Sequence, residues 1–184
     1  KYHVPVRVLS SFNDGCGTLI SLKDESMENA LVSGIASQKD QVKFTLHSVG
    51  DIPGTAFKIL GPISEAEVEV DVIVQNVSID GKTDFTFTVS NEDQEIVKKI
   101  LSNIKDEINY KELIINPDIA KVSLVGAGMR SQSGVASKAF KALSENDVNI
   151  QVITTSEIKI TMVIKEEEVE KAINVLHEEF ELDK

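Results

Sequence analysis

Apolar residues recur along this chain with two periods, one typical of helices and one typical of strands. In four segments they stand three or four positions apart, the spacing that lines one face of an α-helix. The pattern therefore predicts four amphipathic helices. Their apolar positions are Ala56/Ile59/Leu60/Ile63, Val97/Leu101 with Ile100/Ile104, Ala136/Ala139/Phe140/Leu143 and Val169/Ala172/Ile173/Leu176.

The first of these helices contains a proline, because Gly61-Pro62 lies inside its apolar stripe. A proline in a helix interior removes one backbone hydrogen bond and clashes with the preceding turn. We therefore expect this helix to kink or end near Leu60.

Six shorter segments rich in β-branched and aromatic residues fall between the helices. In one of them Phe85, Phe87 and Val89 alternate with polar residues. Alternation with a period of two predicts sheets with one buried face and one wetter face. The predicted strands are 42–46, 68–74, 83–89, 122–125, 148–154 and 158–164.

The same pattern occurs twice, because residues 122–157 repeat residues 42–77 at a constant offset of 80 residues. Nine of these 36 positions are identical, whereas chance at ordinary composition would supply roughly two. The apolar positions also stay in phase without a gap. We conclude that one structural unit is used twice.

Each copy follows the order strand, helix, strand, hairpin, strand, helix, with Asp80-Gly81 as the turn of the first hairpin. Residues 110–115 can add a fourth strand to the first copy, which completes the βαββαβ order of a ferredoxin-like fold. We therefore predict an α+β protein of two such units, each an antiparallel sheet with both helices on one face. The first unit is placed at 41–117 and the second at 118–184.

The second copy lacks a fourth strand of its own, because only residues 180–184 follow its last helix. Two alternating segments, 4–10 and 18–22, precede the first copy. We hypothesise that one of these strands, within residues 1–40, joins the sheet of the second unit, so that the first unit is inserted in the second. The chain also begins inside a predicted strand and without methionine, which indicates a piece of a longer protein.

Composition and charge exclude several classes of protein. The net charge is −11 and no cluster of Lys and Arg occurs, which argues against a nucleic-acid partner. A single cysteine excludes an intrachain disulfide, and three dispersed histidines argue against a metal site. No apolar run is long enough to span a membrane and no signal peptide is evident, so we expect a cytoplasmic protein.

Catalytic and cofactor chemistry are not indicated. Gly126-Ala127-Gly128 resembles the start of a dinucleotide fingerprint, but Ser131 replaces its third glycine and Gln151 stands where a ribose-binding acid is expected. A tight turn between strand and helix explains the same glycines. No nucleophile stands beside a plausible base, no paired carboxylates occur inside an apolar pocket pattern, and no phosphate-binding glycine-rich loop carries a lysine, so we predict no catalytic residue and no cofactor.

Two matched helix starts, residues 51–56 and 132–136, are the first candidate binding feature. Each places a glycine and small residues where a helix presents unpaired N–H groups and a partial positive charge. Such an end can hold a carboxylate. The alternative is a plain cap, in which Asp51 or Ser133 accepts from those N–H groups.

Polar residues that follow the second strand of each copy are the other candidate feature. They are Gln75-Asn76 in the first copy and residues 154–157, Thr-Thr-Ser-Glu, in the second. Near a helix start, these amides and hydroxyls could orient a small zwitterion. Hydrogen-bonded loop residues are the competing explanation.

These motifs resemble the paired ACT domains that form the regulatory half of aspartokinases. Residues 125–131, 134–136, 149–150 and 153–158 are similar to the second ACT domain of that family, and residues 74–78 with Thr83-Asp84 to the first. Residues 7–12 with 17–19 resemble the junction that follows the kinase domain. The resemblance covers nearly the whole chain.

The resemblance implies the regulatory part of an ATP:L-aspartate 4-phosphotransferase, in which the first ACT domain is interposed in the second. It implies a module that binds lysine, threonine or both, the end products of the pathway, and feedback-inhibits aspartate phosphorylation. Its implied partners are a second copy, through the ACT domains, and the kinase catalytic domain of the full-length protein. An ACT-type amino-acid sensor of another enzyme or regulator is the alternative. Other classes are an RNA-binding ferredoxin-like domain, which the negative charge disfavours, and a small enzyme on the same fold.

The resemblance also carries effector-binding positions onto this chain. Those of the first unit are Asp51, Ile52, Gly54, Thr55, Ala56, Gln75 and Asn76, and those of the second are Gly134, Val135, Asn149, Ile150, Ser156 and Glu157. Our hypothesis is that N–H groups near Gly54 hold the effector carboxylate, while Asp51, Gln75 and backbone carbonyls take the ammonium group or side chain. Asn149 and Ile150 would then close the pocket from the other unit.

Overall fold

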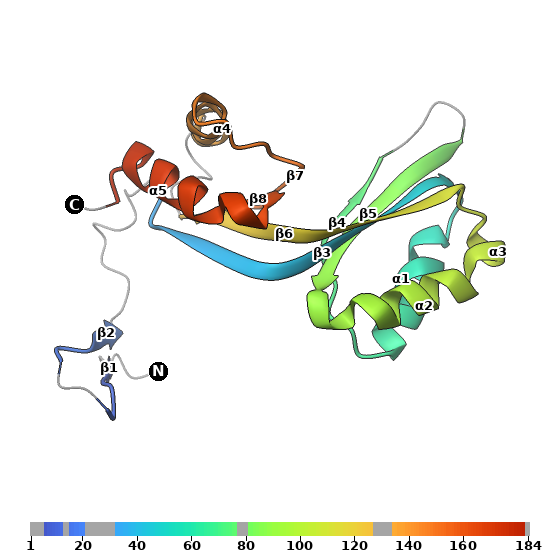
Figure 1. Cartoon of the computed structure of the whole chain (residues 1–184), viewed down its shortest axis with the longest axis horizontal. Coiled ribbons are helices and arrows are strands. Elements are labelled where there is room, and N and C mark those ends of the chain that lie inside the picture. The colour runs from blue at the N-terminus through green and yellow to red at the C-terminus, as the bar shows by residue number, and fades with distance from the viewer. Residues whose placement is uncertain (1–5, 13–14, 21–31, 77–80, 127–133, 183–184) are drawn as a thin grey trace.

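The computed structural model describes residues 6–12, 15–20, 32–76, 81–126 and 134–182. A six-stranded antiparallel sheet, in the order β4-β5-β3-β6-β8-β7, runs through both predicted units (Figure 1). Its strands are β3 (Gly34–Gly50), β4 (Asp71–Gln75), β5 (Lys82–Ser90), β6 (Glu112–Val125), β7 (Val152–Thr155) and β8 (Lys159–Lys165). The helices are α1 (Thr55–Glu65), α2 (Gln94–Asn103), α3 (Lys105–Ile108), α4 (Val135–Glu145) and α5 (Val169–Glu179), and the 3₁₀ turns η2 (Asn91–Asp93) and η4 (Glu166–Glu168) precede α2 and α5.

Strands β3 and β6 belong to both units. Residues 41–50 of β3 pair with β5 on one side and with the first part of β6 on the other, whereas residues 34–38 pair with residues 121–125 of β6. Each unit thus has four strands in ferredoxin-like order, and the predicted pair of units is confirmed. The segments 110–115 and 122–125, which we expected to be separate strands, belong to one strand, because β6 contains residues 112–115 and 122–125.

The strand that completes the second unit is residues 34–38, so our assignment of that role to segment 4–10 or 18–22 was wrong. Within the described residues, β1 (Val6–Val8) and β2 (Thr18–Ile20) pair with each other in a separate two-stranded sheet, apart from the large one (Figure 1). Alternating valines predict a strand but not its partner, and a nearby hairpin partner satisfies them equally well. The proposed unit boundaries at residues 40 and 117 stay predictions.

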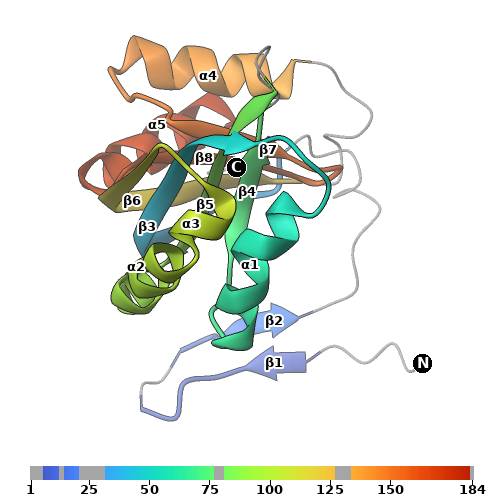
Figure 2. The ribbon, with the colours of Figure 1, turned by 90° about the vertical axis from the view of Figure 1, so that its right-hand side faces the viewer.

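The two long strands are irregular where they pass from one unit to the other. The register of β3 against β6 shifts on both sides of Gln41, and Asp40 and Asp118 have positive φ values of 56° and 58° there. Such irregularities bend a strand and increase its twist, and aspartate tolerates the left-handed region better than most residues. Viewed along the long axis, α4 and α5 lie on one side of the molecule and α1 to α3 on the other (Figure 2).

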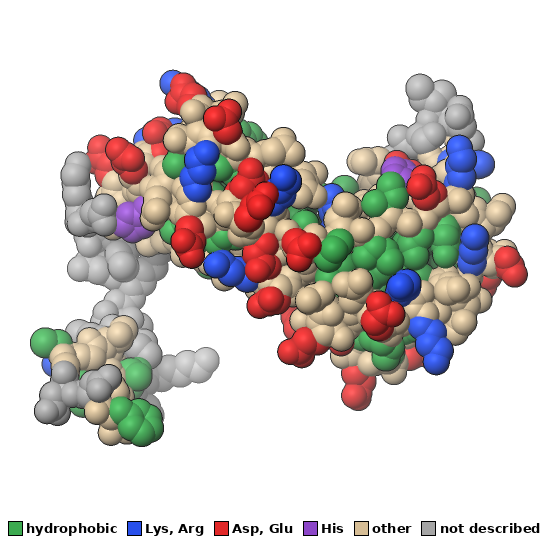
Figure 3. Space-filling model, in the orientation of Figure 1, with side chains coloured by type: hydrophobic (Ala, Val, Ile, Leu, Met, Phe, Trp, Pro, Cys, Tyr) green, Lys and Arg blue, Asp and Glu red, His purple; other side chains and the backbone are tan. Residues whose placement is uncertain are grey.

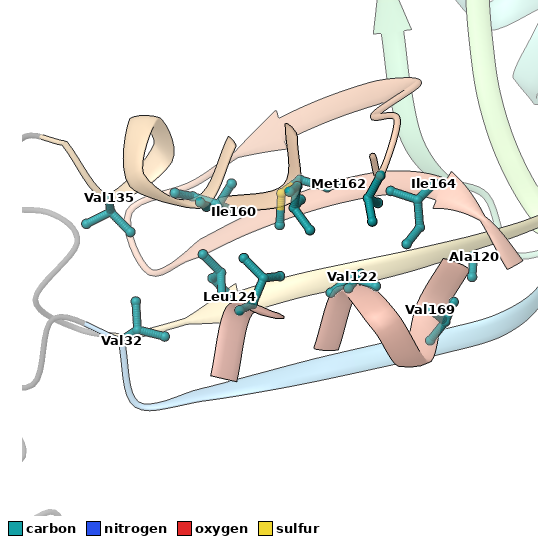
Figure 4. Close-up of a cluster of buried hydrophobic side chains, with 14 residues drawn as sticks. Val32, Ala120, Val122, Leu124, Val135, Ile160, Met162, Ile164 and Val169 are labelled. Atoms are coloured by element: carbon teal, nitrogen blue, oxygen red, sulfur yellow. The ribbon is translucent and has the colours of Figure 1, made fainter. Parts of the chain in front are cut away.

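Each unit buries its own core beneath its helices. In the first core Phe44 and Phe87 stack with their ring centroids 5.5 Å apart. The second core is aliphatic and includes Val122, Leu124 and Met162 (Figure 4). A third cluster of Val72, Ile119 and Val163, with Val152 packed against it, joins β4 of the first unit to β6, β7 and β8.

Helix α1 continues through Pro62 to Glu65, so an end near Leu60 was wrong, whereas the alternative of a kink there stays a prediction. The N–H group that proline lacks would have donated to the carbonyl of Lys58, four residues earlier. Lys58 is exposed, so water can serve that carbonyl instead. Only three residues of the helix follow Pro62, which limits the disturbance.

We predict that the two cores unfold together, because β3 and β6 run through both. Phe87→Ala and Met162→Ala empty equivalent positions of β5 and β8, and each should lower the free energy of unfolding by about 2–5 kcal/mol. Urea unfolding can be followed by far-UV circular dichroism and by the fluorescence of Tyr110, which lies in the first core. Met162→Ala should shift both signals equally. A Tyr110 transition that stays at its original urea concentration would contradict a shared transition.

Candidate functional site

The first candidate site lies where β3 ends and α1 begins. Gly54 is the N-cap of α1 and has a φ of 92°, a left-handed conformation in which an L side chain is strained. The N–H groups of Thr55 and Lys58 donate to backbone carbonyls of Ile52 and Gly54 at 3.2 and 3.0 Å. No side chain caps this helix, so among the described residues the N–H groups of Ala56 and Phe57 have no side-chain acceptor. The alternative in which Asp51 caps the helix is therefore excluded.

Asp51 and Gln75 are brought together from two different segments. The Gln75 amide Nε2 donates to the Asp51 carboxylate Oδ1 at 3.4 Å, and both side chains are exposed. The backbone N–H of Asp51 donates to the carbonyl of Gly81 at 3.0 Å, which ties the loop to the start of β5. A carboxylate and an amide thus stand beside the open start of α1.

The other residues predicted for the first unit occupy different roles. Thr55 is buried and its hydroxyl donates to the carbonyl of Gly50 at 2.8 Å, so this side chain closes the loop. Ile52 and Ala56 are exposed at its rim. Asn76 is exposed as well, and its backbone N–H donates to the carbonyl of Asp84 at 3.3 Å.

A cluster of His47, Ser48 and Asp84, which the sequence did not reveal, supports the end of β3. Asp84 of β5 accepts from the backbone N–H of Ser48 at 2.9 Å with one oxygen and lies 3.0 Å from His47 Nδ1 with the other. The Ser48 N–H group, and to a smaller extent His47, lower the pKa of Asp84 below its ordinary value although partial burial opposes them. Ser48 has a φ of 61° at an irregularity of β3, which an alternating pattern does not signal.

The second unit repeats the helix start. Gly134, the N-cap of α4, has a φ of 103° and again no side chain caps the helix. Val135 is buried in the second core. Ser156 and Glu157 lie in the β7–β8 turn, where the Ser156 N–H donates to the carbonyl of Lys159 at 2.8 Å. Ser133, the alternative cap, lies outside the described residues.

Asn149 and Ile150 line a hollow of about 480 Å³ on their own unit. Its other lining residues, from Phe140 to Val148, also belong to the second unit. Within one chain, therefore, this hollow does not include Asp51 or Gln75. The hypothesis that Asn149 and Ile150 close the first pocket requires a second chain.

Three further findings bear on the classes of ligand and partner. In the part of the chain that is described, no group of three or more His, Cys, Asp or Glu side chains is placed to hold a metal ion. Asp and Glu side chains are spread over the face shown in Figure 3, without a continuous basic patch. None of the described helices is long and apolar enough to cross a membrane.

Comparisons with known proteins agree on one family. Residues 46–109 and 122–180 each match the model of the ACT domain. The chain is 54% identical to an aspartate kinase of Pseudomonas fluorescens over 184 residues, all of this chain and 45% of that protein. The chain thus spans about half the length of the curated relatives it matches.

Two solved structures are similar over nearly their whole length. The aspartokinase alpha and beta subunits share 45% identity with this chain at a TM-score of 0.77, and the match covers 82% of this chain and 99% of that one. The regulatory subunit of aspartate kinase from Thermus thermophilus shares 35% identity at a TM-score of 0.76, with the same coverage.

Gly54→Ala should lower the free energy of unfolding by about 1–2 kcal/mol, because the left-handed backbone strains any L side chain. An added methyl group would meet no atom within 4 Å at either Gly54 or Gly50, but only Gly54 has a left-handed φ. Gly50→Ala is therefore the matched control and should change stability by less than about 0.5 kcal/mol. Equal losses in the two variants, measured by urea unfolding, would contradict this assignment.

Asp84→Asn should lower the melting temperature at pH 7 more than at acidic pH. Because folding lowers the pKa of Asp84, its carboxylate stabilises the fold above its unfolded pKa, and this contribution is lost as pH falls through the folded pKa. The gap between parent and variant should thus be full at pH 7 and should shrink below about pH 4. Thermal unfolding across this range measures the gap, and a gap independent of pH would contradict the role of this carboxylate.

Proposed function

Since this chain belongs to the aspartate kinases, of which it is a regulatory region with two ACT domains, we propose that it binds lysine, threonine or both and thereby inhibits the phosphorylation of aspartate. The arrangement around the start of α1 is the observation that carries this proposal. It offers complementary groups to both charges of an amino acid. The match to aspartate kinases over the whole chain favours this function over a sensor for another enzyme.

The open helix start suits the carboxylate of the effector. The N–H groups of Ala56 and Phe57 have no side-chain acceptor, and the N-terminal end of a helix carries a partial positive charge. Gly54 adds no side chain that would keep a ligand away. The effector carboxylate would therefore lie against the first turn of α1.

The ammonium group or side chain of the effector would then reach Asp51 and Gln75. Because the Gln75 amide nitrogen donates to Asp51 Oδ1, the Gln75 carbonyl oxygen and the second Asp51 oxygen can accept from an ammonium group. A sub-millimolar ligand has a binding free energy of about −4 to −6 kcal/mol. A coupling of about 1–3 kcal/mol to the kinase suffices for strong feedback inhibition.

The two units would contribute unequally to binding. In the sequence repeat, Ser131 and Thr155 stand where the first unit has Asp51 and Gln75, so the second helix start lacks the carboxylate. We therefore propose that the first unit holds the effector. Gly134, Val135, Ser156 and Glu157 would form a lesser site.

We also propose that two chains associate through their ACT domains. Among the described residues, the edge strands β4 and β7 each have one side without a partner strand, and Ile73 and Ile153 on them are about half exposed. In such a dimer Asn149 and Ile150 of one chain would close the effector site of the other. The kinase catalytic domain of the full-length protein would be the further partner, in the cytoplasm.

Gln75→Ala should weaken effector binding about tenfold, because it removes one acceptor for a charged group and leaves Asp51 without its amide partner. Asn174→Ala, which changes an exposed amide side chain on α5, is the control and should bind like the parent. Titration calorimetry with threonine and with lysine measures both. Unchanged affinity of Gln75→Ala for both amino acids would refute the placement. A parent protein that binds neither would refute the proposed function.

A further inference from the structure

Each unit contributes one lysine that contacts a side chain of the other unit across their junction. Lys43 of β3 donates to the Gln151 side chain, which immediately precedes β7, at 2.7 Å. Lys121 of β6 donates to the Asp71 carboxylate, at the start of β4, also at 2.7 Å. Each lysine thus lies on a shared central strand and reaches the beginning of the second strand of the opposite unit.

The two lysines are equivalent by their places in the sheet. Lys43 lies opposite Thr88 and Lys121 lies opposite Val163. Thr88 and Val163 each stand two residues before the last residue of their strand. Their acceptors are equivalent as well, because Gln151 repeats Asp71 at the offset of 80 residues.

Only the contact between Lys121 and Asp71 is an ion pair, and Lys121 is more buried than Lys43. The Lys121 side chain is 5% exposed, whereas that of Asp71 is 53% exposed. Burial raises the pKa of Asp71. The hydrogen bonds from Lys121 and from the Val72 N–H, with the charges of Lys121 and Lys159, lower it by more, so the pKa lies below its ordinary value. A buried ammonium group without a partner is unfavourable, so Lys121 holds Asp71 in place.

Strand β4 contains an extra residue directly after Asp71. Asp71 lies opposite Thr88 and Val74 opposite Thr86, so three steps along β4 match two along β5. Val72 has a φ of 48°, which is strained for a β-branched residue. Its N–H donates to the Asp71 carboxylate at 2.8 Å, and the Thr88 hydroxyl donates to the Asp71 carbonyl at 2.9 Å.

The equivalent strand of the second unit has no such bulge. From Val152 opposite Val163 onwards, β7 pairs with β8 without interruption. If β4 were equally regular, Val72 would lie opposite Thr88, the place that Asp71 occupies. The bulge therefore occurs in the copy that has the buried ion pair and is missing from the copy whose acceptor is neutral.

We propose that Lys121 is a positioning residue for the first effector site: it holds Asp71 opposite Thr88, and the resulting bulge sets how β4 presents Gln75 to Asp51. This inference rests on the proposed function as far as effector binding is concerned. A bulge bends its strand and increases the local twist. The contact of 3.4 Å between Gln75 and Asp51 is near the limit of a hydrogen bond, so a small change in β4 breaks it.

Lys121 also links the proposed effector site to the second unit. The side chain of Val72 packs with Ile119 and Val163, both on strands of the second unit. In a regular β4 Val72 would lie opposite Thr88, and Asp71 would turn to the other face of the sheet, away from Lys121, because successive side chains alternate. Lys121 thus keeps the effector strand of one unit in contact with the core strands of the other.

Lys121→Met tests this proposal with two measurements. Nuclear magnetic resonance should show the cross-strand contact of Thr88 move from Asp71 to Val72. Calorimetry should show the affinity for threonine or lysine fall about tenfold. The control is Lys98→Met, which removes an exposed lysine 3.6 Å from Glu95 on α2 and should change neither. Should Lys121→Met fail to fold, Asp71→Asn removes the same ion pair without changing side-chain size and is measured instead.

Adding Val72→Gly to Lys121→Met distinguishes positioning from a general loss of stability. Glycine adopts a positive φ without strain, so it should restore the bulge and most of the affinity, although it removes a buried side chain. A stability effect alone would grow worse in this double variant.

The proposal is overturned if Lys121→Met keeps the Asp71–Thr88 contact, whether or not affinity changes, or if Val72→Gly fails to restore affinity. A parent that binds no amino acid would refute the proposed function instead. In that case the Thr88 contact still decides whether Lys121 sets the register of β4.

Discussion

The continuous pairing of β3 with β6 is the constraint on which the rest of the molecule depends. A unit of this size buries a limited core by itself, and here neither unit has four strands that belong to it alone. Residues 34–38 of β3 complete the second unit, and the first part of β6 completes the first. Helix packing, the two separate cores and the junction cluster around Val72 all follow from these two strands. The regulatory unit is therefore the pair of ACT domains and not either one.

The proposed effector site shows how two copies of one backbone differ in their side chains. Both copies keep a left-handed glycine at a helix start without a side-chain cap, which is a property of the backbone. The first copy adds Asp51 and Gln75, which meet only because β3 and β4 end at the same side of the sheet. Its strand β4 is also bulged at Val72, whereas β7 is regular. In the proposed site, the shared backbone geometry would hold the effector carboxylate, and the side chains peculiar to the first copy would provide the selectivity.

The helices, most strands and the repeat followed from periodicity, since burial of one face leaves a signal in the sequence. Periodicity did not show which residue of one copy corresponds to which residue of the other. In the sheet Lys43 corresponds to Lys121, an offset of 78 residues, although the sequence repeat aligns at 80. A shift of two residues preserves the alternation of a strand, so the apolar pattern cannot reveal it.

Long-range partners were equally hidden from sequence reasoning. Segment 34–38 contains one large apolar residue and gives a weak strand signal, yet its pairing completes a domain. The supporting cluster of His47, Ser48 and Asp84 depends on an irregularity in β3. Residues 51–56, 75–76 and 134–135 were found from helix-start glycines and polar strand ends, which are local features. The sequence thus indicated the local features of the candidate site but did not indicate the long-range strand partners.

The antiparallel pairing of β3 with β6 suggests how the duplicated chain arose. Gln38 and Lys121 face each other as neighbours on adjacent antiparallel strands, and the whole first unit lies between them in the sequence. The chain thus leaves the second unit and returns to it at almost the same point in space, as a hairpin turn would. A second copy of the gene segment could therefore enter an ancestral hairpin without displacing any strand of the host domain. Insertion at this position would turn one ACT unit into two in a single event, and the strands of the former hairpin would connect the two copies.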